Sequence, residues 1–154
     1  MKCKWMEPLL VLAVFLADRV SKSLVLRHLQ FKKTALLPFF DLTYVENTGV
    51  AFGMFRDSNR FFMAFSAVLI LVLLLFRRKF SGGGAASSAG IALVLGGALG
   101  NFYDRAVYGF VVDFFDLAFF PAVFNVADSA ITAGALLLAA GGWRESRVGV
   151  KRKE

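Results

Sequence analysis

The feature that most constrains this chain is an uncharged apolar run, FFMAFSAVLILVLLLF, which extends from Phe61 to Phe76 and is followed at once by RRK. A helix of about 20 such residues crosses the hydrocarbon core of a bilayer, and basic residues mark the membrane boundary. The whole chain of 154 residues is 58% hydrophobic, whereas about 45–50% is usual for soluble domains. The run therefore predicts a membrane protein.

Three more apolar segments accompany this run, and the first is interrupted by Asp18, Arg19 and Lys22. The four predicted spans cover about 8–26, 61–76, 85–103 and 122–142. We expect residues 1–154 to form a single domain, mainly α-helical: a four-helix transmembrane bundle with a small strand-rich external segment. The N-terminus also resembles a cleavable signal peptide. That alternative is less favoured, because the apolar stretch resumes after Lys22 and three further spans follow.

The distribution of basic residues predicts the orientation in the membrane. If both ends are cytoplasmic, ten lysines and arginines lie inside, in the N-terminus, the loop after Phe76 and the tail, and five lie outside. Basic residues collect on the cytoplasmic side of membrane proteins. The net charge of +7 is therefore explained by topology, and no nucleic-acid partner is expected. The run SGGGAASS, residues 81–88, would then be a flexible cytoplasmic linker.

Two external segments remain, residues 29–59 and 106–121. The first is long for a connection between antiparallel helices, and long connections are often functional. It contains FFDLTYVEN, in which apolar and polar residues largely alternate, and the second contains GFVVDFFD. Both patterns predict β-strands.

Polar residues recur on the faces of the predicted helices. Asp18 and Lys22 are four residues apart and can form an ion pair, which alone would be a structural role. On the third span Asn101, Asp104 and Arg105 share a face with Gly97, and Asn101 and Arg105 could satisfy each other. Gly96 and Gly100 would allow close helix packing.

Two further aspartates stand in apolar surroundings at the same external depth. Asp128 shares a face of the fourth span with Asn125, and Asp113 lies between Val112 and Phe114 without an adjoining basic residue. An ionisable residue in such a place is by default a functional hypothesis. Two carboxyl groups brought close together share a proton, so that one can act as a base on water and the other as an acid.

The sequence lacks the motifs that other hydrolytic mechanisms require. The sequence contains no Gly-x-Ser-x-Gly and no HExxH, and its single Cys3 and single His28 are far apart, so no metal or cofactor is expected. The residues alone leave two other functions open. A small four-helix proton-coupled transporter could use Asp18 or Asp128, and an assembly subunit could use its polar groups only for helix association.

Five motifs in order resemble the lipoprotein signal peptidases (signal peptidase II), a family of bacterial inner-membrane aspartyl peptidases. They are DRVSK (18–22), ENTGVAFGMF (46–55), GGALGNFYDR (96–105), VVDFFD (111–116) and FNVADSAI (124–131). The resemblance implies an endopeptidase that removes the signal peptide from diacylglyceryl-modified prolipoproteins, cutting just before the lipidated Cys. It also implies membrane lipids and globomycin-type inhibitors as partners.

The resemblance also implies roles for particular residues. Asp113 and Asp128 match the catalytic aspartates. The supporting positions are Asn47, Gly49, Asn101, Asp104, Arg105, Asn125, Asp18 and Lys22. The implied location is the bacterial cytoplasmic membrane, with several passes and with the active site near the external face.

The charge count yields a direct test of topology. We expect a reporter fused after Lys153 to behave as cytoplasmic, because the ten inside charges should hold both ends of the chain there. Paired enzymatic and fluorescent reporters that work on opposite sides of the membrane measure this. An external reading for the fusion would overturn the predicted orientation.

Overall fold

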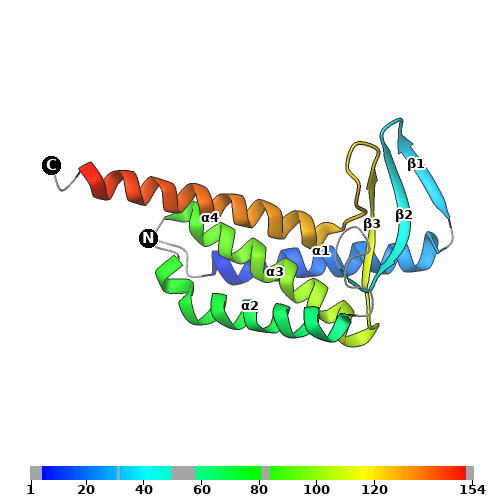
Figure 1. Cartoon of the computed structure of the whole chain (residues 1–154), viewed down its shortest axis with the longest axis horizontal. Coiled ribbons are helices and arrows are strands. Elements are labelled where there is room, and N and C mark those ends of the chain that lie inside the picture. Colours follow the sequence, from blue (N-terminus) through cyan, green and yellow to red (C-terminus); the bar gives the residue numbers. More distant parts are fainter. Residues whose placement is uncertain (1–4, 31, 50–57, 81–83, 152–154) are drawn as a thin grey trace.

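The computed structural model describes residues 5–30, 32–49, 58–80 and 84–151. Its elements in chain order are α1 (Met6–His28), β1 (Lys33–Leu37), β2 (Phe40–Asn47), α2 (Asn59–Phe80), α3 (Ala85–Val107), β3 (Val111–Leu117) and α4 (Val126–Lys151). The helices lie side by side, and the strands gather at one end of them (Figure 1). The chain is thus mainly helical with a small antiparallel sheet, as the sequence predicts.

Helix α3 is the centre of the helical part, because α1, α2 and α4 each pack against it. Small residues make the close contacts possible. Gly96 faces α1, where an added Cβ would lie 2.7 Å from Val14 Cβ, and Gly90 and Gly134 bring α3 and α4 together. The helices therefore associate through small residues, as expected where apolar burial alone gives little drive for association.

The three strands form one antiparallel sheet in the order β1-β2-β3. Val45 on β2 pairs with Asp113 on β3, and Asn47 pairs with Val111. Both predicted strand segments are therefore confirmed. The side chains of β2 do not alternate between buried and exposed, as FFDLTYVEN had predicted. The strand register shifts between Leu42 and Val45, which interrupts the alternation.

Several predicted boundaries differ from the observed ones. Helix α4 begins at Val126 rather than near 122, because Phe124 pairs with Phe115 of β3 and keeps the preceding chain extended. Residues 85–88 of the predicted linker belong to the first turn of α3. Residues 50–57 of the predicted external segment and residues 81–83 of the linker lie outside the described residues.

Two of the described helices are long and apolar enough to cross a membrane by length and composition, at Asn59–Arg77 and Ala85–Val107. A shorter apolar stretch, Val126–Gly142, lies in α4. Helix α1 carries four charged residues in its second half, and two of them, Asp18 and Lys22, are fully buried against the other helices. These two residues thus face protein, whereas Arg27 near the end of the helix is exposed.

Gly97 provides a test of the contact between α3 and α4. An added Cβ would lie 2.5 Å from the Ala127 carbonyl oxygen, so Gly97→Ala must push α4 away. Overpacking of this kind costs about 1–3 kcal/mol, and we expect a lower unfolding midpoint in detergent. Gly142→Ala is the matched control, because nothing lies within 4 Å of its added Cβ. Equal midpoints for the two variants would contradict this packing.

Candidate active site

Asp113 enters the site from β3 and is 1% exposed. Two side-chain amides donate to its carboxyl group, Asn47 Nδ2 to Oδ2 at 2.8 Å and Asn125 Nδ2 to Oδ1 at 2.6 Å. The strand register positions Asn47 next to this carboxyl group, because Asn47 lies on β2, two residues after the Val45 that pairs with Asp113. Asp113 therefore has an amide donor on each oxygen.

Asp128 lies in the first turn of α4 and is fixed there by reciprocal hydrogen bonds with Asn125. The Asp128 backbone N–H donates to Asn125 Oδ1 at 2.9 Å, and the Asn125 backbone N–H donates to Asp128 Oδ2 at 3.2 Å. This is a capping box, in which residues three apart satisfy the free donors at a helix start. Asn125 thus contacts both aspartates: its side chain donates to Asp113, and its backbone donates to Asp128.

Asn101 of α3 completes the set of donors around Asp128. Its Nδ2 donates to Asp128 Oδ1 at 2.8 Å, and its Oδ1 accepts from Lys22 Nζ at 2.8 Å. An ammonium group can only donate, so Lys22 requires the oxygen of the Asn101 amide to face it. Lys22 thereby turns the NH₂ of Asn101 toward Asp128.

Beneath Asn101 lies a buried ion cluster of Asp18, Arg19, Lys22 and Asp104. Lys22 Nζ is 3.1 Å from Asp18 and 2.8 Å from Asp104, and Arg19 is 2.9 Å from Asp18 and 2.6 Å from Asp104. The predicted pair of Asp18 and Lys22 is confirmed as part of this larger set. Two acids and two bases balance in charge, which is what burial requires.

The two acids of the ion cluster also accept hydrogen bonds from backbone N–H groups. Asp18 Oδ1 accepts from the Ala127 N–H at 3.1 Å, at the start of α4. Asp104 Oδ2 accepts from the Val112 N–H at 3.1 Å, next to Asp113. The cluster therefore positions the two elements that carry Asp128 and Asp113.

Arg105 and Gly49 lie at the edge of the site. Arg105 Nη2 is 3.5 Å from the Gly49 carbonyl oxygen, and its guanidinium lies 5.5 Å from the centre of the Phe62 ring. Gly49 itself is held by Asn47, whose Oδ1 accepts its N–H at 3.0 Å. The suggested mutual satisfaction of Asn101 and Arg105 is wrong, because Asn101 bonds to Lys22, Asp128 and Asn125 instead.

Burial first, and then the nearby Asp128 carboxylate, raise the pKa of Asp113 from 3.8 to about 7, against the hydrogen bonds from Asn47 and Asn125, which lower it. Asp113 therefore holds a proton through much of the range in which an ordinary aspartate is ionised. Asp116 behaves differently, because Lys33, at 2.9 Å, lowers its pKa. Asp116 lies in β3, where its carboxylate accepts hydrogen bonds from Lys33 and Thr43.

An apolar groove of about 400 Å³ opens beside Asp128. Its walls are the end of β3, the chain that follows it and one face of α4, namely Leu117, Phe119, Phe120, Phe124, Ser129, Thr132, Ala133 and Leu136. Phe119 is 74% exposed. Among the described residues no group of three or more His, Cys, Asp or Glu is arranged to hold a metal ion.

The structure brings most predicted site residues into one network. Asp113, Asp128, Asn47, Asn101 and Asn125 are joined directly by hydrogen bonds. The sequence analysis did not assign Arg19 to the site, although it forms an ion pair with Asp104. A third charged residue beside Asp18 in an apolar run was a signal that Arg19 has an acidic partner in the protein. The sequence analysis also did not predict the apolar groove. The signal for it in the sequence was the phenylalanine-rich stretch after β3, which includes Phe119 and Phe120.

Comparisons with solved structures place this chain among bacterial membrane enzymes. One structure, described as a bacterial membrane enzyme solved by the in meso method at 2.3 Å resolution, superposes with a TM-score of 0.85 at 27% identity, covering 94% of this chain and 91% of that one. Another, at 1.9 Å resolution, gives 0.81 at 29% identity, covering 90% of this chain and 92% of that one.

The sequence comparisons are more specific. The family model for signal peptidase (SPase) II matches residues 10–144. A lipoprotein signal peptidase of Caldanaerobacter subterraneus subsp. tengcongensis is 42% identical over 135 residues, covering 86% of this chain and 92% of that relative. One from Photorhabdus laumondii is 43% identical, covering 84% and 82%. The chain belongs to the signal peptidase II family. It is therefore a protease of lipoprotein processing, and the transporter and assembly-subunit alternatives are not supported.

The raised pKa of Asp113 predicts how stability changes with pH. Between about pH 4 and 7 the folded protein keeps a proton that the unfolded chain has released, so stability falls as pH rises through this range. Asp113→Asn removes that proton equilibrium. We expect the unfolding midpoint of the unmodified protein to fall more between pH 4.5 and pH 8 than that of the variant.

The control is Asp116→Asn, whose carboxyl group has a lowered pKa because of Lys33. Its stabilising effect is present above the ordinary aspartate pKa and is lost only in more acidic solution. This variant should therefore keep the original slope between pH 4.5 and pH 8. If the unfolding midpoint of Asp113→Asn shows the same pH dependence as that of the unmodified protein, Asp113 does not hold a proton in this pH range.

Proposed function

We propose that Asp113 and Asp128 are the catalytic pair with which this signal peptidase hydrolyses diacylglyceryl-modified prolipoproteins, just before the lipidated Cys. The observation that carries the proposal is the link through Asn125. That one residue donates its side-chain amide to Asp113 and its backbone N–H to Asp128. Two carboxyl groups fixed on one bridging residue, one of them with a pKa near 7, meet the requirement for shared acid and base roles at neutral pH.

In this mechanism the ionised aspartate takes a proton from water, and the resulting hydroxide attacks the scissile carbonyl carbon. The protonated aspartate donates its proton to the carbonyl oxygen. When the tetrahedral intermediate collapses, the aspartic acid that took its proton from water gives it to the leaving amine. The other aspartate takes the proton of a hydroxyl group of the intermediate as the carbonyl re-forms, so the pair returns to its starting state. Asn47, Asn101 and Asn125 hold the two carboxyl groups in position throughout, because each donates to at least one of them.

Asp18, Lys22 and Asp104 act one layer away, by orienting Asn101 and anchoring the chain on both sides of the pair. Arg105 and Gly49 border the substrate entrance, where the Gly49 backbone and the guanidinium face each other. Neither role requires contact with the reacting atoms.

The membrane arrangement that supports this function is a four-helix transmembrane bundle formed by a single domain. Both ends would be cytoplasmic, and the sheet and the aspartates would lie at the external face. The supporting observations are the apolar lengths of α2 and α3, the burial of Asp18 and Lys22 of α1 against protein, and the gathering of the sheet at one end of the helices (Figure 1). A prolipoprotein would then have to present its cleavage site at that face.

The groove beside Asp128 would receive an apolar part of the substrate. Its exposed Phe119 and the apolar residues of α4 provide a surface that continues from the carboxyl pair toward the lipid. Globomycin-type inhibitors would occupy the same region, and membrane lipids would surround it.

Substitution of the pair provides the main test. Asp113→Asn or Asp128→Asn should each abolish cleavage of a lipidated substrate peptide, because an amide of nearly the same shape cannot take or give the proton. General acid–base catalysis contributes about 10²–10⁴-fold. The double variant should be little worse than either single variant, since the two groups act as one unit.

Asp116→Asn is the matched control, because it changes an aspartate on the same strand that bonds to Lys33 and Thr43 instead. It should retain most activity. The readout is a gel-shift cleavage assay with purified protein of checked folding. Cleavage near the normal rate by either single variant would sink the two-aspartate mechanism.

A further inference from the structure

Arg19 is a charged residue of the ion cluster to which the proposed mechanism gives no role. Its two terminal nitrogens contact different acids: Nη1 lies 2.6 Å from Asp104 Oδ1, and Nη2 lies 2.9 Å from Asp18 Oδ2. The Arg19 side chain is 15% exposed, whereas those of the other three members are at most 1% exposed. Arg19 is therefore the member at which the cluster borders its surroundings.

The two carboxylates divide their oxygens between Lys22 and Arg19. Asp18 Oδ1 and Asp104 Oδ2 both contact Lys22 Nζ, at 3.1 and 2.8 Å. The same two oxygens accept the backbone N–H groups at the start of α4 and in β3. The other oxygen of each acid has Arg19 as its only polar partner among the described contacts. Arg19 therefore decides which oxygen of each acid faces the backbone.

We propose that Arg19 is a positioning residue for the catalytic pair, because its guanidinium fork holds both acids in the orientation in which they fix the backbone beside Asp113 and Asp128. This role rests on the function proposed above for the pair. A guanidinium carries donors on separate nitrogens of one rigid plane, so it can bind two carboxylates at once. Without Arg19, one ammonium group would face two buried acids, with a negative charge uncompensated.

Tyr103 of α3 keeps the guanidinium in this place. Arg19 Cζ lies 4.7 Å from the centre of the Tyr103 ring, which is a cation–π distance. The rings of Phe15 and Tyr108 pack edge-to-face with Tyr103, with ring centres 6.3 and 6.4 Å away. Because two neighbouring rings hold Tyr103, the guanidinium rests on a fixed surface and its fork stays aimed at the two acids.

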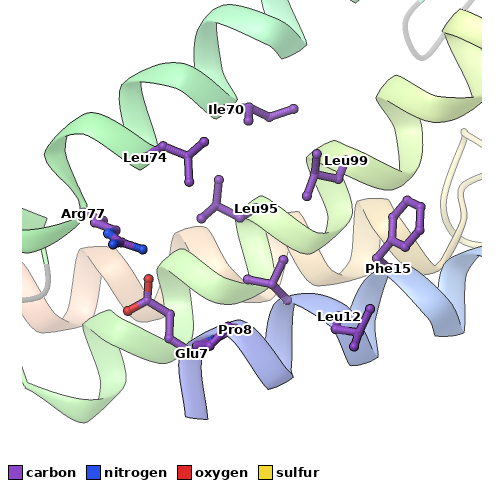
Figure 2. A pocket seen from close by; sticks show the side chains of 10 residues that line it. Glu7, Pro8, Leu12, Phe15, Ile70, Leu74, Arg77, Leu95 and Leu99 are labelled. Atoms are coloured by element: carbon purple, nitrogen blue, oxygen red, sulfur yellow. The ribbon is translucent and has the colours of Figure 1, made fainter. Parts of the chain in front are cut away.

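A cavity of about 330 Å³ opens beside Arg19, between α1 and the end of α3. Arg19, Lys22 and Tyr103 are among the residues that line it, and neither aspartate of the pair does. The apolar groove among α1, α2 and α3 is a different space, lined by Leu12 on the first half of α1 (Figure 2). A small ion could therefore reach the place of the Arg19 side chain without entering the candidate active site.

The first measurement is of kcat and KM for cleavage of a lipidated substrate peptide. Arg19→Ala and Arg19→Gln should lower kcat by up to about 10²-fold, the cost of a misplacement of about 1 Å at reacting groups. KM should stay unchanged, because a positioning residue does not touch the substrate. Arg19→Lys keeps the charge without the fork and should give an intermediate kcat. Arg27→Ala, at an exposed position near the end of the same helix, is the control and should change neither constant.

The second measurement is chemical rescue of Arg19→Ala. Guanidinium ion, added well below denaturing concentrations, should raise the kcat of this variant several-fold, because it can enter the cavity and bind the freed oxygen of each acid. Methylammonium at the same concentration should raise kcat less, since it brings the charge without the fork. Leu12→Ala is the control: it removes a side chain from the other groove on α1, and guanidinium should not raise its kcat.

A normal kcat for Arg19→Ala would overturn the proposal. So would a loss that guanidinium does not restore, a rise in KM at constant kcat, or an equal response of Leu12→Ala. If Arg19→Ala does not fold, Arg19→Lys must still exceed Arg19→Gln in kcat, and equal values would overturn the proposal. Activity in Asp113→Asn or Asp128→Asn would instead refute the catalytic assignment and leave the rescue result standing, whereas a failed rescue would leave the test of the pair standing.

Discussion

The structure depends above all on the ammonium group of Lys22. It lies between Asp18 and Asp104, and each of these acids also accepts a backbone N–H from an element that carries one of the two aspartates of the site. Loss of one partner from a buried ion pair leaves an uncompensated charge at a cost of about 3–5 kcal/mol. The positions of β3 and of the start of α4 are therefore coupled through one side chain of α1.

The same cluster keeps its charges away from the aspartates. Among the described contacts, the groups that donate hydrogen bonds to Asp113 and Asp128 are neutral amides, and the Lys22 ammonium donates to Asn101 rather than to Asp128. A cation in direct contact would hold a carboxyl group ionised, as Lys33 does for Asp116. With amides in that place, Asp113 keeps a pKa near 7. Asn101 thus links Lys22 to Asp128 through two hydrogen bonds and keeps the ammonium group out of direct contact with that carboxylate.

Much of this architecture could be predicted from the sequence, because long apolar runs and strand patterns depend on neighbouring residues. The run ending at Phe76 lies within α2, and VVDFFD lies within β3. The start of α4 could not be placed, because it depends on a bridge between Phe115 and Phe124 and on the capping box at Asn125. The spacing of Asn125 and Asp128 contained that signal.

Contacts between distant helices were harder to predict. The ion pair of Asp18 and Lys22 follows from a spacing of four residues, but the pairing of Arg19 with Asp104 joins two helices and left no local pattern. The orientation of the Asn101 amide likewise depends on Lys22, a residue 79 positions away. Single residues could be nominated from motifs, whereas their donors and acceptors required the packed helices.

Helix α2 is tied to the edge of the candidate site through α3. Asn59 Nδ2, at the start of α2, donates to the carbonyl oxygen of Arg105 near the end of α3 at 3.2 Å. Farther along, Leu73 of α2 packs with Ile91, Val94 and Leu95 of α3. The guanidinium of Arg105 lies 3.5 Å from the Gly49 carbonyl oxygen and over the ring of Phe62 of α2. The position of α2 along α3 is therefore linked to the position of the Arg105 side chain beside the Gly49 backbone.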